Sequence, residues 1–193
     1  MAAGLARWIS VLFDSSVLSV PVFLGLGFVS AGRSGLLWAI LVLVIVTLIP
    51  LSYLLIGRKR GWVTDLELSR RDERPRFILV SLGSDVLALA ALWMGDSPHL
   101  LRLLVLTYFC LAIVMFSISS FWKISMHMAG VAGFSTVLVF VFGPCGLWAF
   151  TSLLLVAWAR LQRRKHDPSQ LIAGAVAGAL VTILVFGLLS RWI

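Results

Sequence analysis

Charged residues and cysteines are both scarce in this sequence. Only 12% of the 193 residues are charged, whereas a soluble domain carries roughly 25%. This shortage excludes an ordinary soluble globular fold. The two cysteines, Cys110 and Cys145, lie within or at the edge of apolar segments, and two isolated thiols supply neither a disulfide framework nor a set of metal ligands.

Apolar residues are abundant instead. They make up 61% of the chain, and the mean hydropathy is +1.05. A membrane span needs about 20 apolar residues, and the apolar segments lie at about 17–31, 35–56, 77–94, 99–119, 126–142, 145–159 and 170–189. Backbone groups in lipid must be satisfied internally. We therefore predict an all-α polytopic transmembrane helical bundle of six to seven spans, as one membrane-embedded domain over residues 1–193.

Two details of these segments carry further expectations. The first segment is short and contains Pro21, so it either spans with a tilt or inserts only half-way. Residues 1–16 carry an apolar stripe that includes Leu5, Trp8 and Leu12, which is typical of a helix lying in the membrane interface. In the last segment Gly174 and Gly178 share one helix face, which lets a neighbouring helix approach closely.

The basic residues gather on one side of the predicted bundle. The connections 57–76, 121–125 and 160–169 are separated from one another by two spans each, so all three emerge on the same side. They contain 12 of the 16 Lys and Arg residues, whereas the opposite side has Arg33, Arg102 and Arg191. The positive-inside rule places these basic loops in the cytoplasm. Their expected partners are membrane lipids and a phosphate group, not nucleic acid.

Two histidines lie on this basic side, each at the start of an apolar segment. His127 follows Lys123 and Ser125, and His166 follows a run of cations. His166 and Gln170 are four residues apart, so they are neighbours where the chain is helical. Cationic side chains could hold a phosphate, while one imidazole attacks phosphorus and the other protonates the leaving oxygen. The third histidine, His99, lies on the opposite side and is expected to be interfacial.

At these residues the sequence resembles the type 2 phosphatidic acid phosphatase superfamily. That family has three motifs: Lys-x6-Arg-Pro, Pro-Ser-Gly-His and Ser-Arg-x5-His-x3-Asp. Here Arg74-Pro75 falls in the 57–76 loop, Ser125-x-His127 within 121–128, and Arg160-x5-His166-x3-Gln170 within 159–170. The order and the internal spacing agree, and the resemblance covers roughly residues 65–178.

The resemblance implies a metal-independent lipid phosphatase without a cofactor. His166 would attack phosphorus and form a phosphohistidine. His127 would act as general acid and then as base, and Gln170 would orient His166. The phosphoryl oxygens would be held by Arg74, Ser125 and Arg160, with help from Lys123 and Arg71.

Departures from the family pattern occur in all three motifs. Glu67 stands where the family has its lysine, so a nearby cation such as Arg71 or Lys123 would have to take over. Ile124 and Met126 replace the proline and glycine of the second motif, which changes that loop's backbone. Gln170 replaces the final aspartate, and it can accept the same hydrogen bond without the negative charge.

Other functions remain open at this stage. A relative that kept the phosphate site but lost the chemistry would bind or move phospholipids. Asp85 is the one acid well inside an apolar segment, and with the basic loops it could serve a small transporter. The orientation has a second possibility too, because bacterial members of the family usually face outward.

Overall fold

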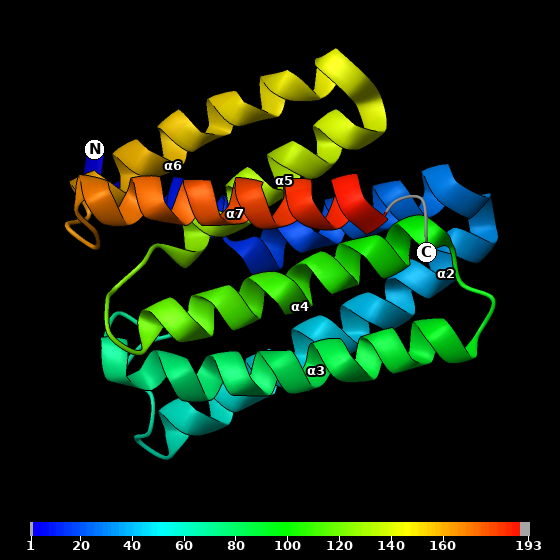
Figure 1. Ribbon diagram of the computed structural model, residues 1–193. Helices are drawn as coiled ribbons and strands as arrows, with labels where there is room; N and C mark the ends of the chain where they lie inside the picture. The colour runs from blue at the N-terminus through cyan, green and yellow to red at the C-terminus, as the bar shows by residue number, and fades with distance from the viewer. Residues whose placement is uncertain (1, 190–193) are drawn as a thin grey trace. The chain divides into compact units, whose positions relative to one another are not determined.

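The computed structural model describes residues 2–189, and all regular structure within them is helical (Figure 1). The elements are α1 (Ala2–Leu12), α2 (Ser15–Lys59), η1 (Arg71–Glu73), α3 (Arg74–Met94), α4 (His99–Ser119), α5 (Met126–Phe142), η2 (Gly143–Phe150), α6 (Thr151–Gln162) and α7 (Pro168–Leu189). The prediction of an all-α chain is confirmed. Within the described residues, five helical stretches are long and apolar enough to cross a membrane. Arg191 lies outside the described residues.

The first two apolar segments form one element, α2, which is sharply bent. Its backbone leaves helical geometry at Ala31 (φ −153°, ψ 25°) and at Gly32 (φ 58°, ψ −130°). A Cβ atom on Gly27 would lie 2.5 Å from the carbonyl oxygen of Gly35. In a straight helix, residues eight apart are separated by about 12 Å. The chain therefore folds back at Gly32, where the positive φ favours glycine.

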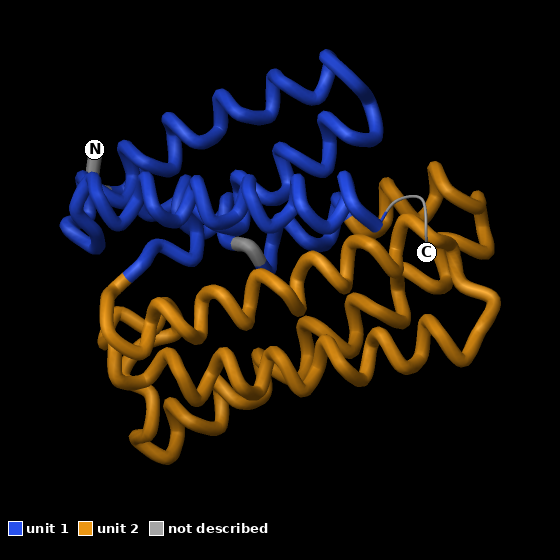
Figure 2. Tube along the Cα trace, in the orientation of Figure 1, with its two compact units in different colours: residues 1–22, 124–192 blue, residues 23–123, 193 orange. Residues whose placement is uncertain are grey.

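The chain divides into two compact units, shown in different colours in Figure 2. Unit 1 comprises Met1–Val22 and Ile124–Trp192, and unit 2 comprises Phe23–Lys123 with Ile193. The fold-back of α2 and the helices α3 and α4 belong to unit 2. The helices α1, α5, α6 and α7 belong to unit 1.

In unit 2, α3 and α4 pack as the tight hairpin that the short connection Gly95–Pro98 predicts. Arg102 closes the turn, because its Nε donates to Ser97 Oγ over 2.8 Å and its Nη2 donates to Gly95 O over 3.2 Å. Ser97 Oγ in turn donates to Leu92 O over 2.6 Å. Trp38 of α2 packs directly on Gly95, where any side chain would collide with its ring.

In unit 1, α5 packs along α7 through glycine, as the small-residue series predicts (Figure 1). A Cβ on Gly178 would collide with the backbone of Ala129, including its Cα at 2.9 Å. A Cβ on Gly174 would collide with the carbonyl oxygen of Ser125 and lie 3.2 Å from Met128 Cβ. The expected close approach between helices is therefore confirmed, and it occurs beside the second motif.

The connection after α5 differs from a simple turn between two α-helices. The chain reverses at Gly143 (φ 62°) and continues as the 3-10 helix η2, so α6 begins only at Thr151. Pro144 lies at the start of η2, where it cannot donate a backbone hydrogen bond. Gly146 lies against the backbone of Leu138, so η2 packs closely on α5 before α6 begins.

Candidate active site

His166 is oriented by Gln170 in the structure. Its Nδ1 lies 2.8 Å from Gln170 Oε1. A carbonyl oxygen accepts hydrogen bonds, so Nδ1 carries the proton and Nε2 keeps its lone pair. His166 is buried, with 8% of its surface exposed. In the neutral ring, this tautomer has its lone pair on Nε2.

Asp167 holds Gln170 in place from the start of α7. Its Oδ1 accepts from Gln170 N over 2.9 Å and from Ser169 Oγ over 2.6 Å. These hydrogen bonds lower the pKa of the Asp167 carboxyl, the bond from Ser169 having the largest effect. Asp167 therefore caps α7 by accepting from the backbone N of Gln170. The side chain of Gln170, and not Asp167, forms the hydrogen bond with His166.

The second motif is joined directly to the third. Ser125 caps α5, because its Oγ accepts from Met128 N over 3.3 Å. Its own backbone N donates to Gln170 O over 3.2 Å. Together with the contact of Gly174 on the Ser125 carbonyl, this bond places the start of α5 beside the start of α7. The predicted neighbours Ser125, His127, His166 and Gln170 therefore belong to one region of unit 1.

Arg160 brings a buried cation to the end of α6 in the same unit. Only 2% of its surface is exposed, and a cation in the last turn of a helix is stabilised by the helix dipole. Its carbonyl oxygen accepts from Lys165 N over 3.1 Å, which tightens the turn that leads to His166. Arg160 is buried as deeply as an apolar core residue, although burying a cation is costly.

His127 has a partner that sequence reasoning missed. Its Nε2 lies 3.2 Å from Oδ2 of Asp14, which stands between α1 and α2. The side chain of His127 is 9% exposed and that of Asp14 is 34% exposed. One signal could have pointed to Asp14, since it is the only acid among the first 64 residues.

The first motif and its helpers lie in unit 2. Arg74 is 1% exposed, and its Nε donates to Leu68 O over 2.9 Å. Arg71 is exposed, and its Nη1 donates to Phe121 O over 2.6 Å, which ties the basic loop to the segment after α4. Lys123 follows in that segment and is half-buried. The three predicted phosphate ligands of this unit thus lie on its basic loop or on the segment bonded to it.

The acids of the basic loop pair within it. Asp72 accepts from Arg70 over 2.8 Å, and this hydrogen bond lowers the pKa of Asp72 and raises that of Arg70. Both oxygens of buried Glu73 accept from Thr64 N over 3.2 Å. Asp65 Oδ1 accepts from Glu67 N over 2.8 Å. The contacts of these acids thus stabilise the loop itself.

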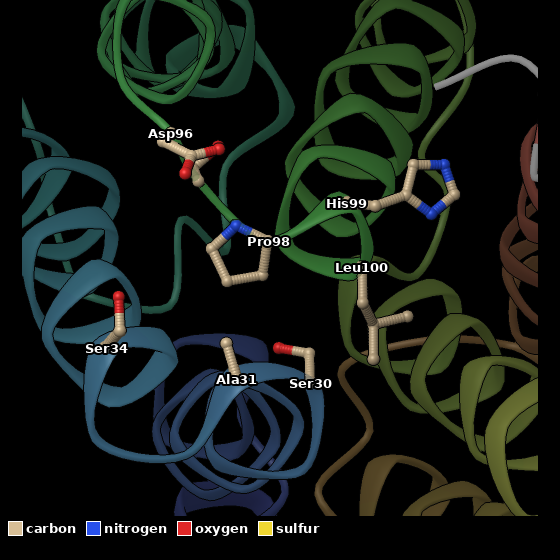
Figure 3. Close-up of a pocket in the computed structure, with 8 residues that line it drawn as sticks. Ser30, Ala31, Ser34, Asp96, Pro98, His99 and Leu100 are labelled. Carbon is tan, nitrogen blue, oxygen red and sulfur yellow. The ribbon is translucent and has the colours of Figure 1, made fainter.

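A separate cavity of about 450 Å³ lies in unit 2, where the α2 fold-back meets the start of α4 (Figure 3). Its polar lining consists of Asp96 and the serines 30, 34 and 97, and none of its lining residues is cationic. In Figure 3 the ring of His99 is turned away from Asp96 and Ser34. The lining is therefore unsuited to a phosphate group.

No protein-family model, no curated protein and no solved structure matches this chain. The resemblance to lipid phosphatases therefore rests on the motif residues of the sequence.

Proposed function

We propose that this protein is an integral, multi-pass membrane enzyme of six to seven spans that removes phosphate from a lipid phosphate or diphosphate. The hydrogen bond between His166 and Gln170 carries the proposal, because it orients a buried histidine at the position of the nucleophile in the resembled family. Ser125, His127 and Arg160 are buried polar residues of the same unit and supply a donor, an acid and a cation.

The reaction proceeds in two displacements. His166 Nε2 attacks phosphorus, the bond from phosphorus to the leaving oxygen breaks, and His127 gives that oxygen a proton. Water then attacks the phosphohistidine while His127 takes a proton from it, so the N–P bond breaks and phosphate leaves. Donors that already point at the phosphoryl oxygens stabilise both transition states. The motif resemblance assigns this role to Arg160 and Ser125, and also to Arg74, Arg71 and Lys123.

The surroundings of the histidines support a lipid substrate. His127 lies at the first turn of α5 and His166 directly precedes α7, both of which are apolar helices. A lipid substrate with its tail in the bilayer brings its phosphate to such a helix end. Polyprenyl phosphates and lipids like phosphatidic acid share this chemistry. The excess of Lys and Arg in the basic loops favours a cytoplasmic site.

Phosphate release by the purified protein in detergent and EDTA tests the proposal, with dioleoyl phosphatidic acid and farnesyl diphosphate as probes. Replacing the nucleophile in His166→Ala is expected to lower kcat by about a thousandfold or more. His99→Gln is the matched control, because His99 belongs to the other unit and lines the cavity that is unsuited to a phosphate group. We expect it to keep wild-type turnover. Equal rates in both variants would contradict the assignment.

The same assay separates the competing functions. A phospholipid-binding relative would bind vesicles of phosphatidic acid but release no phosphate from either probe. A transporter would depend on Asp85, which is 3% exposed within α3. For a phosphatase, Asp85→Asn is expected to change kcat by less than about threefold, because no step of the proposed reaction uses this carboxyl.

A further inference from the structure

Asp14 makes two different contacts with its two carboxylate oxygens. Oδ1 accepts from Ser16 N over 3.0 Å, which caps α2. Oδ2 lies 3.2 Å from Nε2 of His127. The cap explains the first contact and leaves the second unexplained. We propose that Asp14 is a positioning residue that holds and charges His127 for proton transfer, an inference that rests on the proposed function.

The neighbours of Asp14 hold it firmly in place. Phe13 and Leu18 pack on either side of it against a core cluster that contains Met128, the residue after His127. The backbone oxygen of Asp14 accepts from Leu18 N over 2.9 Å. The Asp14 carboxylate that contacts the His127 imidazole is therefore held by the packed connection between α1 and α2.

The helix before Asp14 adds a second anchor. Ala6 and Ser10 are buried where α1 packs on α6. Leu5, Trp8 and Leu12 are exposed on α1, and such an apolar surface suits the membrane interface. Asp14 therefore follows a helix that packs on α6 with one face and exposes an apolar surface on another.

The contact assigns a role to each nitrogen of His127. With Nε2–H donated to Asp14, the proton for the leaving oxygen comes from Nδ1. After the transfer the ring is neutral, keeps its proton on Nε2, and has a lone pair on Nδ1 that accepts the proton of the attacking water. The carboxylate stabilises the doubly protonated ring that starts the cycle.

The elements around α5 bring other charged or titratable groups to unit 1, namely Arg7 of α1, Arg160 of α6, and Lys165, His166 and Asp167 before α7. The cations oppose charge on His127. Asp167 is engaged by Ser169 and Gln170. Asp14 is the carboxylate that contacts the ring.

Two substitutions separate positioning from capping. Asparagine and serine both cap helices well, so Asp14→Asn and Asp14→Ser keep the first contact. Asparagine still reaches His127, but with its oxygen on Ser16 N its NH2 faces Nε2 and donates instead of accepting. Serine is too short to reach the ring. With the phosphate-release assay we expect kcat to fall about 10- to 100-fold for both Asp14→Asn and Asp14→Ser, with KM unchanged within about twofold. Equal kcat in all three proteins would overturn the proposal.

A spectroscopic readout tests the contact without any turnover. The chain has three histidines, so ¹⁵N-histidine labelling and single His→Gln variants assign every ring. We expect a slowly exchanging, downfield ring N–H proton of His127 in the wild type, and its loss in Asp14→Ser.

The two measurements also separate the inference from the proposed function. Phosphate release without the His127 signal in the wild type would overturn the role of Asp14 and leave the phosphatase standing. The signal without phosphate release from either probe would overturn the phosphatase and the catalytic role of Asp14, leaving the contact as structural.

Discussion

At the scale of single residues, the amide of Gln170 decides where the proton of His166 lies. The amide oxygen accepts from Nδ1 at 2.8 Å, so the neutral ring has its lone pair on Nε2, the nitrogen that attacks phosphorus in the proposed reaction. An amide does this without a negative charge. It therefore orients the ring but stabilises the cationic phosphohistidine less than the aspartate of the resembled family would.

Gln170→Glu tests this reading of the amide. The carboxylate keeps the length of the side chain and adds the missing charge, so we expect kcat for phosphate release to rise about tenfold. Gln170→Leu removes the acceptor and is expected to lower kcat by about 10- to 100-fold. A faster leucine variant, or an inactive glutamate variant that is still folded, would argue against an orienting role.

At the scale of helices, α7 meets α5 backbone to backbone. Gly178 faces Ala129, and Gly174 faces the carbonyl of Ser125 at the cap of α5. The same glycine face that stabilises the helix pair therefore also aligns Ser125 with Gln170. Packing and site geometry are coupled along this one face.

Gly178→Ala is expected to destabilise unit 1. The added Cβ collides with the backbone of Ala129, which cannot move aside as a flexible side chain would. Overpacking of this kind costs about 1–3 kcal/mol, measured as a lower thermal midpoint in detergent. Gly187→Ala is the control on the same helix, because nothing lies within 4 Å of its added Cβ. A similar loss in both variants would show that the contact with Ala129 is not responsible, because alanine itself favours a helix more than glycine does.

At the scale of the whole molecule, the basic loops set the expected topology. The loops before α3 and before α7 carry most of the cations, whereas the α3–α4 turn carries Asp96. Cationic loops are retained in the cytoplasm during insertion. The sequence thus predicts one membrane side for the histidine motifs and the other side for Asp96.

Cysteine labelling checks this topology in intact cells. In a background in which Cys110 and Cys145 are replaced, Arg60→Cys and Arg164→Cys are expected to resist a membrane-impermeant maleimide until the cells are opened. Asp96→Cys should react in intact cells. All three positions are exposed in the structure. Labelling of the first two variants from outside would place the site on the external face.

Features that depend on residues close together in the sequence could be predicted from the sequence alone. Apolar runs of span length identified the helices, and α4 occupies His99–Ser119 as predicted. The short polar connection Gly95–Pro98 forced the α3–α4 hairpin. The four-residue spacing predicted that His166 and Gln170 are neighbours, and they are hydrogen-bonded although His166 precedes α7 and is not itself helical.

Only the tertiary structure could decide the rest, because it depends on segments that are distant in sequence. The close approach of Gly27 to Gly35 shows that α2 folds back, and no periodicity reveals it. The bond from Ser125 N to Gln170 O and the contact of Asp14 with His127 arise when α5, α7 and the α1–α2 junction pack together. Sequence determined the membrane class and the residue types of the site, since these follow from composition and short spacings. Packing determined which of those residues meet, since one chain pattern is compatible with many helix arrangements.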